Sequence, residues 1–199
     1  MNDDLLEALG ENEKKLFNDL NSLNNQLSSY YLSKWKRSLP FSEMLSNRWE
    51  KAGNLKFGAG TSIYDDVLVL GEVNVGEKTW IGPYVVLDGS GKLIIGNNCS
   101  ISAGVHIYTH NSVKWAVSGG KTPYDYRPTI IGNNCFIGPH AIIQMGITIG
   151  DHCIVGANSF VNSNLPANSI SVGSPAKTIG RVKIDSDGEV SLVYDESQR

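Results

Sequence analysis

The sequence predicts an all-β solenoid in which the chain winds into a triangular parallel β-helix. Large apolar residues recur every six positions between residues 57 and 161, many are followed directly by glycine, and small residues recur four positions later. An α-helix has a period of 3.6 residues and a plain strand a period of two, so neither produces this spacing. A hexapeptide β-helix, with three hexads to each triangular coil, does.

The apolar positions of the repeat form one continuous series with two irregularities. A two-residue slip follows the sixth position, and a longer interruption follows the ninth. We expect each of these anchors to point inward and to stack on the anchor one coil away. The anchors are Phe57, Ile63, Val69, Val75, Ile81, Leu87, Ile95, Ile101, Ile107, Ile131, Ile137, Ile143, Ile149, Val155 and Val161.

Glycine and small residues occupy two further columns of the repeat. Glycine follows the anchor at positions 58, 76, 82, 96, 132, 138, 150 and 156, where we expect it to relieve a tight corner with a positive φ. On one face the fourth residue after the anchor is Thr61, Thr79, Cys99, Cys135 or Cys153. The cysteines are therefore predicted to form an interior ladder rather than a redox or metal site, and a reducing compartment is the simplest interpretation.

The two ends of the chain depart from the repeat. Residues 1–56 are predicted to form an N-terminal helical segment, with a helix over 3–33, a break at Pro40 and a shorter helix over Phe41–Lys51. The β-helix is predicted to occupy residues 57–180. Residues 181–199 are predicted to form a C-terminal hairpin and tail around Asp187-Gly188.

The longer interruption is interpreted as a loop, residues 111–130, extruded from the β-helix. Its Gly119-Gly120 pair and prolines favour turns, and long loops in compact domains are usually functional or disordered. Trp115, Tyr124, Tyr126 and Arg127 give it a composition suited to lining a pocket, and the loop begins beside His110. His110 is therefore the leading candidate for a catalytic residue.

Composition narrows the class of protein. The 199 residues carry a formal net charge of −3 and no dominant cluster of lysine and arginine, so nucleic-acid binding is not expected. No apolar run approaches the roughly 20 residues that a membrane helix needs, and membrane insertion is not expected either. The acidic start MNDDLLEALGENEKK is unlike a secretory signal, which predicts a cytoplasmic location.

Four segments together resemble a known family. GVHIYTH (104–110), IGNNCFIGPHAII (131–143), GITIGDHCIVGANSFV (146–161) and VGSPAKTIG (172–180) are similar to the hexapeptide-repeat acetyltransferases. The resemblance is greatest to the maltose and galactoside acetyltransferases and their polysaccharide O-acetyltransferase relatives. It implies a left-handed β-helix, a homotrimer with active sites at subunit interfaces, and acetyl-CoA as the donor substrate, with no metal.

The resemblance also assigns roles to residues. His110, which ends the Tyr-Thr-His run, corresponds to the general base, and Asp88 to an acidic residue that binds the acceptor. Trp115, Tyr124 and Arg127 of the loop are added as acceptor-binding candidates. The residues assigned to coenzyme A are Phe136, Gly138, Ala157, Asn162, Lys177 and Arg181.

The expected reaction is transfer of an acetyl group from acetyl-CoA to a hydroxyl of a sugar or polysaccharide precursor. A neutral imidazole can take the hydroxyl proton near neutral pH, and the thioester needs no metal because a thiolate leaves readily. The sugar enzymes have an asparagine where this chain reads Gly82-Pro83-Tyr84, which disfavours a free galactoside or maltose as acceptor.

The sequence leaves three alternatives to a sugar O-acetyltransferase open. The acceptor is alternatively an antibiotic or an amino sugar. A zinc enzyme of the carbonic anhydrase type would recruit His106, His110 and His140 across an interface. A non-catalytic scaffold would leave the loop without a purpose. His140 and His152 fall at turn positions of the repeat, where solvated turn residues are expected.

Overall fold

The computed structural model describes residues 6–195, which divide into two compact units. The first runs up to Ser46, and the second begins at Asn47. The first unit contains α2 (Glu11–Trp35) and α3 (Phe41–Leu45), and the Tyr31 hydroxyl donates to the Met44 carbonyl at 3.4 Å. The second unit opens with α4 (Arg48–Asn54) and contains the β-helix.

The helix boundaries differ from the predicted ones. The helix predicted over 3–33 begins later than expected, at Glu11 after the extended Gly10. Lys36 adopts a left-handed conformation, φ 56°, and closes α2 at Trp35, two residues beyond the predicted end and ahead of Pro40. The predicted helix over Phe41–Lys51 is two helices. Ser46 is extended, and the Asn47 side chain accepts from the N–H groups of Trp49 and Glu50 to start α4 anew. The first residues of the predicted helix, 3–5, lie outside the described residues.

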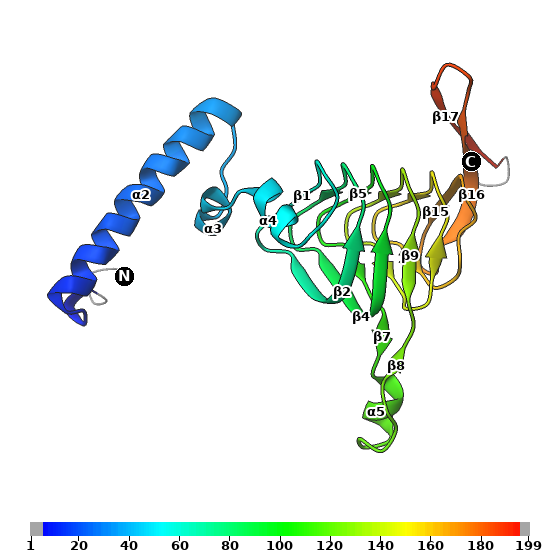
Figure 1. Ribbon diagram of the computed structural model, residues 1–199, viewed down its shortest axis with the longest axis horizontal. Coiled ribbons are helices and arrows are strands. Elements are labelled where there is room, and N and C mark those ends of the chain that lie inside the picture. Colours follow the sequence, from blue (N-terminus) through cyan, green and yellow to red (C-terminus); the bar gives the residue numbers. More distant parts are fainter. Residues whose placement is uncertain (1–5, 196–199) are drawn as a thin grey trace. The chain divides into compact units, whose positions relative to one another are not determined.

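The second unit is a parallel β-helix with three sheet faces (Figure 1). The first face stacks β1 (Ser62–Ile63), β3 (Trp80–Ile81), β5 (Ser100–Ile101), β10 (Phe136–Ile137), β13 (Ile154–Val155) and β15 (Ser169–Val172). The first halves of β2 (Leu68–Val75) and β4 (Val86–Ile95) form the second face with β6 (His106–Ile107), β11 (Ile142–Ile143) and β14 (Phe160–Val161). Their second halves form the third face with β9 (Thr129–Ile131) and β12 (Thr148–Ile149). The predicted left-handed β-helix with helical N-terminal segment is confirmed.

The interior is the predicted stack of anchors. All are buried except Val69, which is half-buried against the others. The cysteine ladder is also interior: the three thiols are free and buried. The Sγ atoms of Cys99, Cys135 and Cys153 each donate to a carbonyl of the following coil at 3.1 Å. These residues therefore serve packing and coil-to-coil hydrogen bonding.

The glycines that follow the anchors do not have the predicted positive φ, and that prediction is wrong. The left-handed residues sit two positions later in the hexads, for example Asn98, Asn134, His140 and His152. The glycines are needed because the next coil passes too close for a Cβ. A Cβ on Gly96 would lie 2.7 Å from the Gly132 carbonyl carbon. The two histidines are turn residues, as expected.

The predicted hairpin follows the last coil and extends the first face. β16 (Lys177–Ile184) pairs antiparallel with β15 on one side and with β17 (Val190–Tyr194) on the other. The turn contains Gly188 at φ +85°. Among residues 6–195, no helix combines the length and the apolar character needed to cross a membrane.

We predict that Gly96→Ala destabilises the protein by about 1–3 kcal/mol, because the added methyl group forces two coils apart. Gly53→Ala is the matched control, since a Cβ there meets nothing within 4 Å and the position is helical. It should be neutral or stabilising by up to about 1 kcal/mol. Urea unfolding of both variants provides the measurement, and equal stabilities would contradict the close-approach explanation.

Candidate active site

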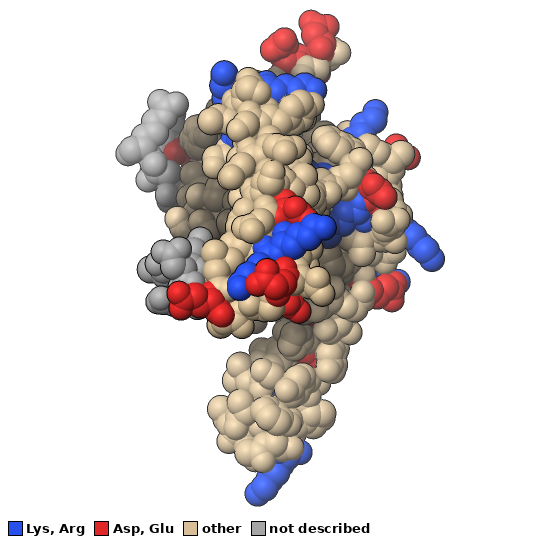
Figure 2. Space-filling view, turned by 90° about the vertical axis from the view of Figure 1, so that its left-hand side faces the viewer, with Lys and Arg blue, Asp and Glu red and all other residues tan. Residues whose placement is uncertain are grey.

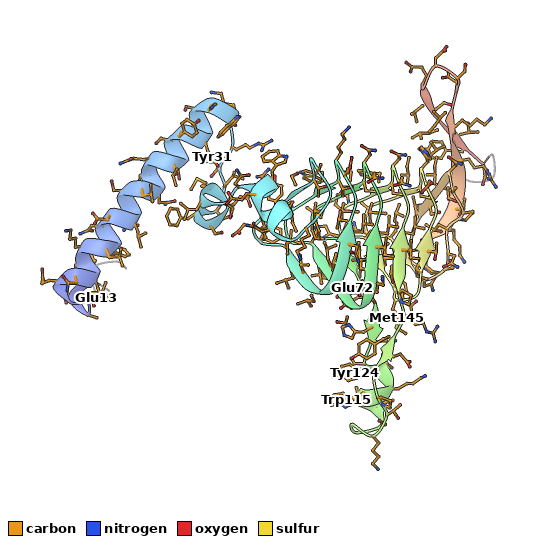
Figure 3. All side chains as sticks on the ribbon, viewed as in Figure 1. Glu13, Tyr31, Glu72, Trp115, Tyr124 and Met145 are labelled. Carbon is orange, nitrogen blue, oxygen red and sulfur yellow. The ribbon has the colours of Figure 1, made fainter. Side chains whose placement is uncertain are left out.

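The interruption of the repeat forms an arm at the corner between the second and third faces. We define the arm as residues 110–127. It contains β7 (His110–Asn111), α5 (Val113–Val117) and β8 (Asp125–Tyr126), and it projects from the β-helix (Figures 1 and 3). Few charged residues lie on the arm surface seen in Figure 2. At its root, the Arg127 N–H donates to the Thr109 carbonyl at 2.9 Å.

Successive side chains of residues 106–110 point alternately to the outside and to the inside of the β-helix at this corner. Ile107 and Thr109 point inward and are 0% exposed. His106, Tyr108 and His110 alternate with them and are half-buried at the outer surface. The imidazole of His110 therefore stands outside the β-helix at the foot of the arm, with its side chain 31% exposed.

A buried carboxylate holds the imidazole. Asp88 Oδ2 lies 2.6 Å from His110 Nδ1 and accepts from the Thr109 N–H at 2.9 Å. Oδ1 accepts from the Ser90 N–H at 3.0 Å. Because an ionised carboxylate only accepts hydrogen bonds, Nδ1 is the donor and the lone pair of a neutral ring is on Nε2. This arrangement is the one that a general base requires.

The two-residue slip in the repeat builds the support for Asp88. The β2–β4 register shifts from Gly71↔Gly89 to Val73↔Leu93, so the extra residues of β4 bulge outward. The Gly91 N–H of this bulge donates to Thr109 Oγ1 at 2.7 Å, and Thr109 Oγ1 donates to the Asp88 carbonyl at 2.8 Å. The bulge in one coil and the base of the arm in the next are thereby joined.

The surroundings of Asp88 favour its ionised form. Burial alone raises the pKa of this carboxyl. Hydrogen bonds from the Ser90 side chain, the backbone N–H groups of Thr109 and Ser90, and the His110 ring outweigh that effect and lower the pKa to about 2. Asp88 is therefore a buried anion beside His110 at any physiological pH.

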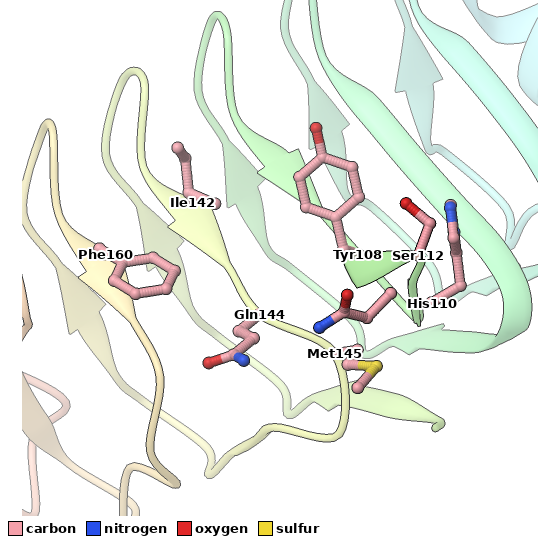
Figure 4. Close-up of a pocket in the computed structure, with 8 residues that line it drawn as sticks. Tyr108, His110, Ser112, Ile142, Gln144, Met145 and Phe160 are labelled. Carbon is pink, nitrogen blue, oxygen red and sulfur yellow. The ribbon is translucent and has the colours of Figure 1, made fainter. Parts of the chain in front are cut away.

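A groove of about 350 Å³ opens beside the imidazole (Figure 4). It is lined by Tyr108, His110, Asn111, Ser112, Ile142, Gln144, Met145 and Phe160. Ile142 and Phe160 are outward residues of neighbouring coils on the second face, and they give the groove an apolar wall. The Tyr108 hydroxyl is 3.1 Å from His106 Nδ1. The groove thus combines one base, polar groups and an apolar strip.

The predicted acceptor-binding residues differ in burial and in the groups that they contact. Asp88 is 0% exposed with both oxygens engaged, so direct acceptor binding does not fit its position, whereas holding His110 does. The Tyr124 ring stacks on His110 and the Trp115 ring meets Tyr124 edge-on. Arg127 is exposed and its side chain lies against Gly146.

The predicted coenzyme residues do not line the His110 groove within one chain. Phe136, Ala157, Asn162, Lys177 and Arg181 are exposed on later coils and on β16. Gly138 is buried, and a Cβ there would lie 2.6 Å from the Ala157 nitrogen, so its glycine serves coil packing. Sequence reasoning missed Tyr108, Ile142, Gln144, Met145 and Phe160. The apolar outward residues directly before anchors Ile143 and Val161 were a usable signal.

The depressed pKa of Asp88 makes a pH-dependent contribution to stability. The folded-state pKa of about 2 is below the ordinary value of 3.8, so the contribution is present above about pH 4 and is lost as the pH falls toward 2. The free-energy gap between wild type and Asp88→Asn should shrink by about 2 kcal/mol between pH 5 and pH 2. Denaturant unfolding measures it, and a constant gap would contradict the assigned ionisation.

The chain is similar in sequence to proteins that contain hexapeptide repeats. Residues 128–163 match the family model described as the hexapeptide repeat of succinyl-transferase. The galactoside O-acetyltransferase of Escherichia coli is 29% identical over 128 residues, covering 54% of this chain and 63% of that protein. The chain thus spans less than two thirds of this relative's length.

Two solved structures are similar over more of the chain. A maltose O-acetyltransferase from Clostridium difficile is 26% identical with a TM-score of 0.56, over 84% of this chain and 89% of that chain. A point mutant of the Bacillus cereus N-acyltransferase AntD, in complex with dTDP and coenzyme A, is 26% identical with a TM-score of 0.58. That match covers 63% of this chain and 72% of the other. These similarities confirm the resemblance to the hexapeptide-repeat acetyltransferases.

Proposed function

We propose that this chain is an acyltransferase that moves an acetyl group from acetyl-CoA to a hydroxyl of a sugar or polysaccharide precursor. The observation that carries the proposal is the His110 imidazole, fixed through Nδ1 by the buried Asp88 carboxylate at the edge of a groove. The acetyltransferases that share the repeat support the choice of reaction.

In the proposed mechanism, Nε2 of His110 removes the proton of the acceptor hydroxyl as its oxygen attacks the thioester carbonyl. A C–O bond forms and the carbonyl electrons move to oxygen. The resulting tetrahedral intermediate collapses, the C–S bond breaks, and the imidazolium proton passes to the departing thiolate. Asp88 holds the ring in the reactive tautomer and stabilises the imidazolium electrostatically, as the carboxylate does in a serine protease triad.

We place coenzyme A between neighbouring copies of the chain in a homotrimer. AntD, which has a similar structure, binds coenzyme A, and the residues assigned by resemblance are exposed on the later coils. Lys177 and Arg181 would pair with phosphates, and Ala157, Asn162 and Phe136 would contact the rest of the coenzyme. Because these positions lie away from the groove of their own chain, a site shared between copies accounts for both sets of residues.

A second class of acceptor, an amino sugar, is supported by one of the similar structures. Galactoside and maltose enzymes among the similar proteins favour an O-acetylated sugar. AntD is an N-acyltransferase bound with dTDP, which supports a nucleotide-linked amino sugar as the second candidate. Both acceptors present a nucleophile that a neutral imidazole can deprotonate, so the same proton transfer serves either reaction.

Replacing the proposed base tests this function directly. We expect His110→Asn to lower acetyl transfer by at least roughly 100-fold, the range that general-base catalysis contributes, while His152→Asn leaves it unchanged. His152 is the matched control because it is a turn residue at φ 58°, a conformation that asparagine also adopts. The measurement is thiol release from acetyl-CoA with sugars, nucleotide sugars, amino sugars and antibiotics. Undiminished turnover by His110→Asn would refute the proposal.

A further inference from the structure

We propose that Tyr124 is a positioning residue that acts through His110, orienting the imidazole that Asp88 anchors. The inference rests on the proposed function of His110 and adds a residue to that site. It replaces the sequence-based expectation that Tyr124 binds the acceptor.

Contacts around the imidazole carry the proposal. The rings of His110 and Tyr124 have centroids 6.1 Å apart and planes inclined by 11°, an offset-stacked arrangement. The ring of Trp115 meets Tyr124 edge-on at 5.5 Å and 78°. Tyr126, paired with His110 across β7 and β8, adds a tilted contact at 6.1 Å. Three aromatic rings of the arm thus form one cluster with the base.

The position of Tyr124 outside the groove favours a role in orienting the imidazole over a role in binding the acceptor. The residues that line the groove include His110, Asn111 and Ser112, but Tyr124 is not among them. Tyr124 therefore contacts the base without belonging to the surface on which the reaction is proposed to occur. A residue so placed affects the reaction through the imidazole that it contacts.

A second contact is needed because one hydrogen bond does not fix a ring plane. Asp88 holds Nδ1, but 31% of the His110 side chain is exposed and the ring can tilt about that bond. Stacking against Tyr124 restricts this tilt. The electron-rich face of a tyrosine also favours the imidazolium that forms when Nε2 takes the proton.

The described charged side chains near the cluster contact the edge of the imidazole or groups other than its ring plane. Asp88 is the carboxylate bonded to the ring. Lys114 and Asp125 of the arm pair with each other at 3.2 Å. The Arg127 side chain lies against Gly146. The arm therefore contacts the plane of the imidazole through the rings of Tyr124 and Tyr126.

Three variants of the 199-residue chain test the proposal: Tyr124→Leu, Tyr124→Phe and, as a remote control, Tyr194→Leu on the exposed strand β17. Tyr124→Leu should lower kcat roughly tenfold while KM for acetyl-CoA and acceptor changes less than about twofold. Tyr124→Phe keeps the ring and should restore nearly the full rate. Tyr194→Leu should match wild type.

A proton NMR spectrum provides the readout that does not depend on turnover. The downfield Nδ1–H resonance of the His110–Asp88 hydrogen bond should persist in wild type and Tyr124→Phe and broaden in Tyr124→Leu. Loss of rate in Tyr124→Phe with a raised acceptor KM would overturn the proposal in favour of acceptor binding by the hydroxyl. An unchanged resonance and kcat in Tyr124→Leu would overturn it as well. If His110→Asn stays active, the catalytic proposal fails, yet the resonance still reports whether Tyr124 orients the ring.

Discussion

The close approach of consecutive coils, backbone against backbone, is the constraint on which the rest of this structure depends. Gly96 and its counterparts lack a Cβ where the next coil passes, and the Cys and Thr column donates to carbonyls of that coil. Such contacts hold one coil in register with the next. The register in turn lets Asp88 of one coil reach Thr109 and His110 of the following coil.

The site arises where two neighbouring coils break the repeat at the same corner. The bulge after Gly89 supplies the Ser90 and Gly91 N–H groups beside Asp88, while the next coil leaves the β-helix as the arm. Burying a charge at such a defect is costly unless its oxygens are hydrogen-bonded. Backbone N–H groups and the His110 ring donate hydrogen bonds to the two Asp88 oxygens. Among the described residues, no buried side-chain N or O atom lacks a hydrogen-bond partner.

Much of this architecture could be predicted from the sequence, because a period of six leaves few alternatives. The anchors, the cysteine ladder and the position of His110 at the break all follow from the period. The hydrogen bond between Asp88 and His110 could not be predicted in this way. The two residues are 22 positions apart, and spacing along a chain does not say which carboxylate oxygen meets which ring nitrogen. The role of the glycines could not be predicted, because the repeat does not show how closely the backbones of two coils approach. The exact end of α2 could not be predicted, because a left-handed lysine such as Lys36 has no strong sequence signal.

Catalysis as proposed requires Nε2 of His110 to face the thioester carbon in a groove shared between copies of this chain. A crystal structure with coenzyme A bound tests this requirement most directly. We predict the coenzyme thiol in the groove beside Tyr108 and Gln144, about 3.5 Å from the reacting edge of the imidazole, with its phosphates at Lys177. Coenzyme A bound with its thiol outside this groove, or His110 turned away from Asp88, would contradict the proposed mechanism.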